Sequence, residues 1–551
     1  MRALLLYPIF PSSFWSFEKA VEGLGKKAFM PPLSLVTVAS LLPQSWDFRL
    51  IDHNIESVSE EDWEWADLVL MSGMIAQKKD FLEQIREAKK RGKKVVVGGP
   101  YATSLPNDFL EVGVDYLVLD EGEYTIPLFL EALENGNESG IFRSKEKPDL
   151  SISVIPRFDL LKMDAYFVMA IQYSRGCPFK CEFCDIIILY GRKPRTKTSD
   201  QIKRELNAMK ELGWRGGIFF VDDNFIGNKR TVKPFLEDLI VWQKDNGYPF
   251  SFYTEASIDM AHDDELLKLM VYSKFSTVFI GIETPDTDSL KLTLKNQNTK
   301  VPMNESLQKI AGYGIRIMGG FIIGFDGEKK DAGERVYQFA VENSIPGVTF
   351  SMLQALPGTA LWDRLKNESR LLDAANLNQT TLLNFIPSRP VEEISEEYVE
   401  TFWKLYEPKN YLTRVYKHFR MVGKAEVHSD PKIRKALANT HKTDKNLNGL
   451  LILLKIFWKQ GLYRNTRVIF WKYLWQMWKH NRAGIGNYLS YAAFIEHFVY
   501  YRKMVKEQIE EQVSYRKDTE TDIPQNDIEL SEEKKSEIIW YEPELEHEKV
   551  I

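Results

Sequence analysis

Short apolar runs alternate with longer amphipathic stretches over residues 1–135 of the chain. The apolar runs are rich in Val, Ile and Leu, which is typical of strands buried on both faces. The amphipathic stretches between them, such as Pro32–Leu42 and Lys79–Arg91, read as helices. The alternation therefore predicts a parallel sheet with helices on both faces. The expected strands are Ala3–Tyr7, Phe48–Asp52, Leu68–Ser72, Val95–Gly99 and Tyr116–Asp120.

A second alternating series begins after a polar stretch at residues 134–165. Helical segments at Asp200–Leu212 and Thr231–Asn246 separate its strands. Six strand–helix units in a row predict a parallel barrel or partial barrel, in which chemistry takes place at the carboxyl ends of the strands. The expected strands are Val168–Tyr173, Gly217–Val221, Phe250–Thr254, Thr277–Ile282, Arg316–Ile323 and Val348–Leu353.

The pattern changes again near residue 375, and the region up to about residue 510 is predicted to be mostly helical. Beyond Ser514 the chain is acidic and poor in apolar residues, so we expect disorder there. The fold class is therefore α/β with a helical C-terminal part. The predicted divisions are a doubly wound domain at 1–140, a linker at 141–164, a barrel at 165–372, a helical extension at 373–512 and a tail at 513–551.

Bulk composition narrows the function classes. The chain has 551 residues and a net charge of -6, so it carries no global field that would attract nucleic acid. Pro8 and Pro11 interrupt the apolar N-terminal run, which reads as a buried first strand rather than a signal peptide. No segment reaches the roughly 18 apolar residues of a membrane span. We expect a cytoplasmic protein without a nucleic-acid partner.

The chain has three cysteines, all within eight residues, at Cys177, Cys181 and Cys184. An odd, clustered set is a poor disulfide framework and favours metal chemistry in a reducing compartment. Thiolates are the ligands that iron–sulfur centres prefer. A cubane has four irons, so three protein ligands leave one iron open to a substrate or cofactor. A zinc site of four cysteines is excluded by the count, whereas one of three cysteines and a histidine stays open.

The spacing Cys-x3-Cys-x2-Cys after the first strand of the second series, with Phe183 before the last cysteine, resembles the radical S-adenosylmethionine (SAM) superfamily. The resemblance covers about residues 165–370. It implies a 4Fe–4S cluster on the three cysteines, whose open iron chelates the amino and carboxylate groups of SAM. It also implies a 5′-deoxyadenosyl radical and an external electron donor such as flavodoxin or ferredoxin.

The resemblance also assigns SAM contacts to the ends of later strands. Acidic residues after the second strand would bind the methionyl ammonium, carboxylates after the third and fourth would bind ribose hydroxyls, and the sixth segment would lie near adenine. Each segment alone is weak, since a pair of aspartates at a strand end is commonly a helix cap. The residues concerned are Phe183, Asp222, Asp223, Glu255, Ser257, Glu283, Gln354 and Pro357.

A doubly wound domain before a radical barrel resembles the cobalamin-binding class of the superfamily. In such sheets ligands bind beyond the carboxyl ends of the strands, where small residues let a flat ligand approach closely. Ordinary turns are the alternative. His53 lacks the Asp-x-His-x-x-Gly spacing of a cobalt ligand, so we assign it a surface or capping role. The residues expected around cobalamin are Ser72, Gly73, Gly98, Gly99, Glu121, Gly122 and Glu123.

Together these resemblances predict a cobalamin-dependent methyltransferase acting on an unactivated carbon. The C-terminal extension, with Tyr406–Arg414 and the His497–Phe498 pair, resembles the subgroup that contains hopanoid C-2 methylases, which favours a small or lipid-like substrate. One alternative is a radical SAM cyclase or C–C bond-forming enzyme with an accessory cobalamin domain. Another, from a different class, is an iron–sulfur redox sensor or binding protein.

Residues 448–503 combine nine Lys and Arg with one acidic residue, Glu496, and many aromatics. Trp471, Trp475 and Trp478 fall on one helical face. A basic, aromatic helix can contact a membrane surface. The alternative, which we favour from the sequence, is a helical lid with the aromatics in its core and the lysines in solvent.

Overall fold

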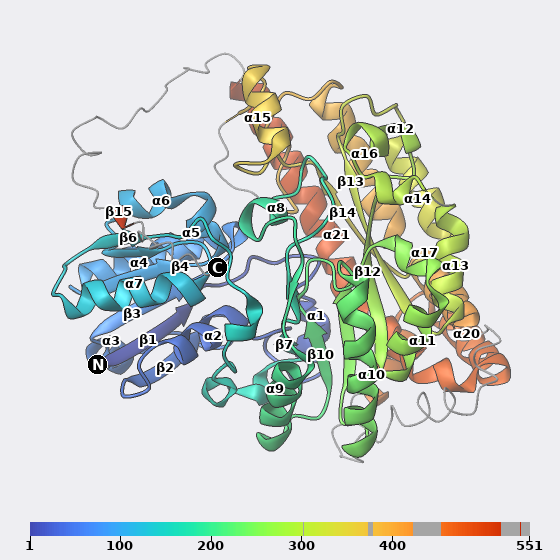
Figure 1. Ribbon diagram of the computed structural model, residues 1–551. Helices are drawn as coiled ribbons and strands as arrows, with labels where there is room; N and C mark the ends of the chain where they lie inside the picture. Colours follow the sequence, from blue (N-terminus) through green and yellow to red (C-terminus); the bar gives the residue numbers. More distant parts are fainter. Residues whose placement is uncertain (301, 373–377, 423–452, 520–539, 542–551) are drawn as a thin grey trace, which may run out of the picture. The chain divides into compact units, whose positions relative to one another are not determined.

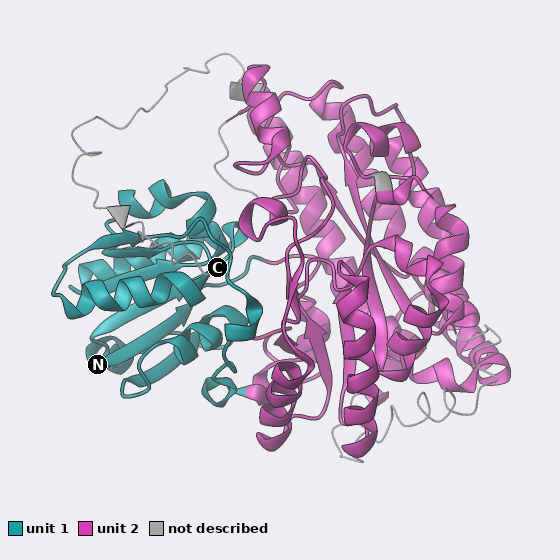
Figure 2. Ribbon diagram, viewed as in Figure 1, with its two compact units in different colours: residues 1–11, 32–162, 519–551 teal, residues 12–31, 163–518 magenta. Residues whose placement is uncertain are grey.

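The computed structural model describes residues 1–300, 302–372, 378–422, 453–519 and 540–541 (Figure 1). Contacts divide the chain into two compact units. Unit 1 contains residues 1–11, 32–162 and 519–551, and unit 2 contains residues 12–31 and 163–518 (Figure 2). Most of the predicted disordered tail, at 520–539 and 542–551, lies outside the described residues.

Unit 1 is built on a parallel sheet in the order β15-β6-β5-β4-β3-β1-β2. The first strand lies between the second and third, so the chain winds outward in both directions. This is the doubly wound arrangement that the sequence predicts, and its switch point lies between β1 and β3. The strands are β1 (Arg2–Tyr7), β2 (Asp47–Asp52), β3 (Leu68–Ser72), β4 (Lys94–Gly98), β5 (Tyr116–Val118), β6 (Gly140–Phe142) and β15 (Trp540–Tyr541).

Apolar side chains of the strands and helices form the core of unit 1, with Val69, Phe81 and Val97 fully buried. Strand β6 lies at the start of the segment that the sequence suggests is a polar linker, and it pairs with β5. The helices are α2 (Leu33–Leu41), α3 (Glu60–Trp65), α4 (Lys78–Lys90), α5 (Pro100–Ser104), α6 (Pro106–Glu111) and α7 (Gly122–Glu134).

Unit 2 contains a parallel six-stranded sheet in the order β14-β13-β12-β11-β10-β7. Each strand pairs with the next one of the series, as in a partial barrel, and this confirms the predicted strand–helix succession. The strands are β7 (Met169–Ile171), β10 (Gly217–Phe220), β11 (Ser251–Glu255), β12 (Phe275–Glu283), β13 (Arg316–Ile323) and β14 (Gly347–Met352).

The helices of unit 2 flank this sheet and then continue into a helical C-terminal part (Figure 1). Several begin at side-chain caps, such as Thr198 before α9 and Asp263 before α11. The helices are α1 (Glu18–Gly23), α8 (Ile186–Leu189), α9 (Ser199–Glu211), α10 (Lys229–Asp245), α11 (Asp264–Tyr272), α12 (Thr287–Leu292), α13 (Met303–Gly312), α14 (Ala332–Glu342), α15 (Ala360–Asn367), α16 (Val391–Leu405), α17 (Pro408–Met421), the π-helix η9 (Phe457–Tyr463), α20 (Arg467–His480) and α21 (Ile485–Thr519).

Residues 12–31 pack in unit 2 although the sequence places them in the first domain. Their aromatic side chains explain this, because the ring of Phe14 lies 5.2 Å from that of Phe498 and the ring of Phe17 lies 5.0 Å from that of Phe494. Helix α21 continues to Thr519, past the predicted end of the extension. Among the described helices, none is long and apolar enough to cross a membrane.

Candidate active site

The three cysteines lie on a loop whose two ends are joined by an antiparallel strand pair, β8 (Ser174–Arg175) with β9 (Arg195–Thr196). The backbone N–H of Cys177 donates to the carbonyl of Gly191 at 3.2 Å. Gly176 has φ +93°, and a Cβ there would come within 2.7 Å of the same carbonyl oxygen. Only glycine fits this position, so the turn into the first cysteine is fixed by the backbone.

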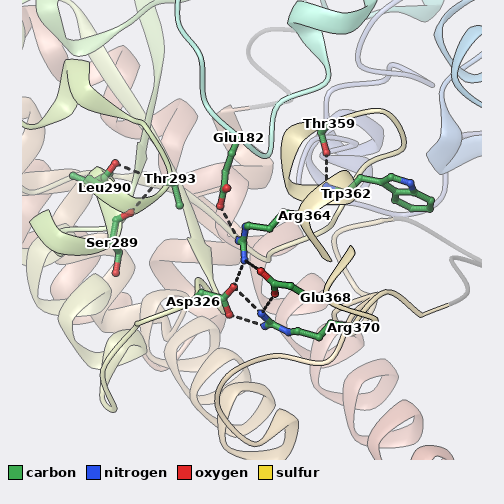
Figure 3. Close-up of polar contacts among 10 residues, drawn as sticks. All are labelled: Glu182, Ser289, Leu290, Thr293, Asp326, Thr359, Trp362, Arg364, Glu368 and Arg370. Atoms are coloured by element: carbon green, nitrogen blue, oxygen red, sulfur yellow. Dashed lines mark hydrogen bonds and ion pairs between the residues drawn. The ribbon is translucent and has the colours of Figure 1, made fainter. Parts of the chain in front are cut away.

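Glu182, between the second and third cysteines, fastens the loop to neighbouring helices (Figure 3). Its carboxylate accepts from Arg364 of α15 at 3.1 Å, and its N–H donates to the carbonyl of Thr293 at 3.2 Å. Arg364 also pairs with Asp326 at 2.8 Å, and Asp326 pairs with Arg370 at 2.7 Å. This network ties the cysteine loop to α15 and to the segment that follows β13.

The protonation of the cysteine thiols bears on how the loop could hold a metal cluster. All three are free, and Cys181 is buried. Burial raises the pKa of Cys177 and of Cys184, so in the cofactor-free protein these thiols hold their protons. Cationic irons would reverse that preference, because a coordinating thiol loses its proton to the metal.

Carboxylates gather at the carboxyl ends of three neighbouring barrel strands. Burial, with repulsion from Asp222, raises the pKa of Asp223 to about 7, and burial with repulsion from Asp223 and Glu283 raises the pKa of Glu255 to about 8. Asp223 also accepts from the N–H of Gly176 at 3.4 Å. Neighbouring desolvated carboxylates of this kind fit a cationic ligand, which would relieve their repulsion.

Asp222 is differently placed. Its two oxygens accept from the backbone N–H groups of Tyr173 and Ser174 and from the Ser174 hydroxyl, the last at 2.5 Å. Burial raises the pKa of Asp222 to about 6 in spite of these bonds. In the described structure this carboxylate braces the chain that enters the cysteine loop.

Glu283, at the end of β12, forms a buried ion pair with Lys295, its Oε1 2.6 Å from Nζ. A Cβ on Gly281 would overlap the Glu283 carboxylate, so the pair requires a glycine there. Burial lowers the pKa of Lys295, but attraction to Glu283 and Cys181 outweighs it and the pKa is raised. Lys295 Nζ also lies 6.0 Å from the ring centre of Phe183.

Two residues of the connection between α12 and α13 were missed from the sequence. Lys295 brings a cation to the cysteine loop, and the amide nitrogen of Gln297 lies 3.7 Å from Cys181 Sγ. Asn298 holds the connection in place by donating to the carbonyls of Gly281 and Ile282, both at 3.0 Å. No motif marks this stretch, and only the pairing of its lysine with a strand-end glutamate could have drawn attention to it.

The remaining residues predicted to contact SAM follow the carboxyl ends of β11 and β14. Ser257 follows β11 and exchanges hydrogen bonds with Asn224, which also bonds the Cys177 thiol. Gln354 follows β14 and donates to the carbonyl of Leu382 at 3.0 Å, while its own carbonyl oxygen is buried without a partner among the described residues. Pro357 lies three residues further on and is partly exposed.

The carboxyl edge of the unit 1 sheet is built from glycines and one hydroxyl. The Ser72 hydroxyl is buried and has no hydrogen-bond partner among the described residues. Gly99 has φ +91°, and a Cβ there would overlap that hydroxyl; a Cβ on Gly98 would lie 2.7 Å from the Val118 carbonyl. Gly73 is nearly as crowded, with Phe81 at 3.1 Å. Bare backbone and an unpartnered hydroxyl fit a broad ligand at this edge.

The loop after β5 completes that edge. Glu121 and Glu123 are buried at the start of α7 on either side of Gly122, and Glu123 accepts from Ser153 at 3.0 Å. His53 is not at the surface as expected: its side chain is 10% exposed, and its Nδ1 lies 3.3 Å from Asp80 Oδ2.

Comparison with known proteins gives these two edges a context. The chain matches the B12 binding domain family over residues 27–130 and the radical SAM superfamily over residues 171–340. It also matches a domain of unknown function (DUF4070) over residues 359–511. It is 54% identical over 515 residues to an uncharacterized methyltransferase of Synechocystis sp., covering 93% of this chain and 94% of the relative.

A second relative has a named activity. The hopanoid C-2 methylase of Rhodopseudomonas palustris is 34% identical over 508 residues, covering 91% of this chain and 94% of that enzyme. The chain belongs to the B12-binding radical SAM methylase family. As a family member it is a cobalamin-dependent radical SAM methyltransferase, with a 4Fe–4S cluster, SAM and cobalamin as its cofactors.

Solved structures agree on the fold of this methylase. The cobalamin-dependent SAM radical enzyme OxsB aligns with a TM-score of 0.56 at 16% identity, over 95% of this chain and 81% of that one. The radical SAM methyltransferase TsrM from Kitasatospora setae aligns with a TM-score of 0.55 at 14% identity, over 72% of this chain and 82% of that one. At these identities the likeness extends to the architecture alone.

Proposed function

We propose that this enzyme transfers a methyl group to an unactivated carbon of a lipid-like substrate. In this proposal Cys177, Cys181 and Cys184 hold the cluster, and the strand-end carboxylates of unit 2 bind SAM. The glycine-lined edge of unit 1 binds cobalamin. The observation that carries the proposal is the group of half-buried, proton-retaining carboxylates beside the cysteine loop, because a cationic cofactor is what such a group accommodates.

The substrate class is supported by the relatives. The name of the Rhodopseudomonas palustris enzyme gives a hopanoid, a lipid, as its methyl acceptor, and the alignment with it includes the helical extension. A hopanoid C-3 methylase of Methylococcus capsulatus is 28% identical over 410 residues, covering 68% of this chain and 76% of that enzyme. Both names give a hopanoid as the methyl acceptor, which supports a lipid-like substrate for this enzyme.

When bound, the cluster, SAM and cobalamin supply the radical and the methyl group. The protein's own task is to position these groups and to control charge. Asp223 and Glu255 would attract the ammonium and sulfonium of SAM, while Lys295 neutralises Glu283 and keeps the site from excess negative charge. Gln297 would donate to the sulfur of Cys181, and such bonds tune iron–sulfur centres. This chemistry needs no acid–base pair.

The test is an anaerobic assay with methyl-labelled SAM, cobalamin, reduced flavodoxin and an extract of polar and neutral lipids. The enzyme should incorporate the label into an apolar product, and a Cys181→Ala variant should incorporate none. If SAM is cleaved at the rate of product formation but the product is unlabelled, the cyclase alternative is correct. Label in a water-soluble product alone would contradict the lipid-like substrate.

A further inference from the structure

Helix α20 is apolar on two opposite faces. Phe470 and Met477 on one face are fully buried. The opposite face carries Trp475 and Trp478, which are 58% and 53% exposed, and Val468, which is 73% exposed. A surface helix ordinarily has one apolar stripe toward the core and a polar face in solvent. The exposed second stripe contradicts the prediction that these tryptophans lie in the core of a helical lid.

The π-helix η9 extends the exposed stripe. Trp471 of α20 donates its indole N–H to the carbonyl of Gly461 at 2.8 Å, and its ring stacks on Phe457 at 5.5 Å. A Cβ on Gly461 would lie 2.8 Å from the indole, so this glycine lets the two helices meet. We call the resulting patch the α20 surface; it contains Trp458, Leu462, Tyr463, Val468, Trp471, Trp475 and Trp478, each at least 44% exposed.

Positive charge surrounds this surface. Residues 455–482 contain seven Lys and Arg and no Asp or Glu. Lys479 lies 5.6 Å from the ring of Trp475, and Arg482 lies 4.5 Å from that of Trp478. Glu496 of α21 is bonded by Arg464 at 2.8 Å. The described residues of the α20 surface are therefore aromatic and basic, with no acidic residue among positions 455–482.

We propose that the α20 surface docks on the anionic face of a lipid bilayer. Tryptophan prefers the boundary between headgroups and acyl chains, and lysines beside it can reach the lipid phosphates while their stems stay in the apolar layer. Basic groups close to an anionic surface strengthen such docking by electrostatic attraction. A protein partner would need acidic groups matched to each lysine, whereas an anionic bilayer offers negative charge everywhere. Docking differs from spanning, and no described helix is apolar enough to span.

The experiment is cosedimentation of the full-length holoenzyme with vesicles of phosphatidylcholine alone and of phosphatidylcholine mixed equally with phosphatidylglycerol. Two variants test the surface: Trp475→Ser with Trp478→Ser, and Lys472→Glu with Lys479→Glu. The matched control is Val241→Ser with Lys244→Glu on α10, since Val241 is an equally exposed apolar residue outside the α20 surface. Cluster absorbance should be the same in all four proteins.

The wild type should bind the anionic vesicles at least about tenfold more tightly than neutral ones, and each α20 variant should lose at least that factor while the control retains it. High salt should weaken wild-type binding without restoring the tryptophan variant. Equal binding by all proteins, or none by the wild type, would overturn the proposal. If the wild type does not bind vesicles, but the tryptophan variant differs from it in sedimentation coefficient without vesicles, the α20 surface binds a second copy of the chain instead. Because this readout needs no methyl transfer, its failure is separable from that of the proposed function.

Discussion

The carboxyl edges of the two sheets differ in the residues that line them. In unit 2 the strand ends bring together half-buried carboxylates, Asp223 and Glu255, and the Glu283–Lys295 ion pair beside the cysteine loop. In unit 1 the strand ends carry glycines and a buried serine hydroxyl, and the carboxylates of that edge, Glu121 and Glu123, lie at the start of α7. Both edges belong to parallel sheets, where ligands bind at the carboxyl ends of strands.

The difference indicates what each edge recognises. Ionising the desolvated carboxylates of the unit 2 edge is costly until a cation arrives, so under the proposed assignment this edge would select a small cationic ligand by electrostatics. Glycines leave the backbone of the unit 1 edge open to close approach, so under the same assignment that edge would select a broad ligand by shape. One fold principle thus serves two cofactors of unlike chemistry within one chain.

The largest effect is expected from removing one cysteine, which should abolish function at the unit 2 edge and leave the unit 1 edge unchanged. Cys184→Ala removes one of three thiolates, and two cannot hold a cubane with one open iron. We expect complete loss of the cluster's visible absorbance and of SAM cleavage, with cobalamin binding by the purified protein unchanged. Retained SAM cleavage would show that the cysteine loop is not the cluster site, and lost cobalamin binding would show that the edges are not independent.

The next effect addresses the unit 1 edge. Gly99→Ala puts a Cβ against Ser72 and forces a residue other than glycine to φ +91°. We expect cobalamin to bind at least about tenfold more weakly, with the cluster absorbance retained. Gly92→Ala is the matched control, because Gly92 also has a positive φ, +69°, but a Cβ there would meet nothing within 4 Å. Equal losses in both variants would attribute the effect to backbone strain rather than to the edge.

The fold could be predicted because buried parallel strands leave uninterrupted apolar runs, and all six barrel strands lie where those runs do. Strand β6 was missed because three residues leave too short a pattern. At the site, spacing identifies the cysteines, but no local pattern separates Asp222, which accepts from Tyr173 and Ser174, from Asp223, which accepts from Gly176. Lys295 and Gln297 reach the cysteines only through tertiary packing, so sequence alone could not have placed them there.

Exposure likewise depends on tertiary structure. The spacing of Trp471, Trp475 and Trp478 shows that they share one helical face, but not whether that face points to the core or to solvent. We predicted a core-facing stripe, because an apolar face of a helix usually packs against the core. The structure reveals the opposite because Phe470 and Met477 already occupy the inward face of α20.

The smallest effect concerns the charge of the unit 2 edge. Glu255 has a pKa of about 8 in the folded protein, above its ordinary value of 4.5, because of burial and the repulsion of Asp223 and Glu283. Between these two values the unfolded chain releases a proton that the folded chain retains. The free energy of unfolding of the cofactor-free protein should therefore fall as pH rises from about 4.5 to 8, and fall no further above that.

Glu255→Gln removes the titrating group, so the free energy of unfolding of the variant should no longer fall with pH on account of this residue. In urea unfolding of the cofactor-free protein, the variant should gain about 1–2 kcal/mol over the wild type between pH 5 and pH 8. The same variant should bind SAM about tenfold more weakly, because it lacks a carboxylate for the cation. Glu237→Gln, on an exposed position of α10, should change neither quantity. A variant that gained no stability yet bound SAM weakly would mean that Glu255 is already ionised and paired before the cofactor binds. A stability gain with unchanged SAM affinity would mean that the buried charge at this edge serves something other than SAM.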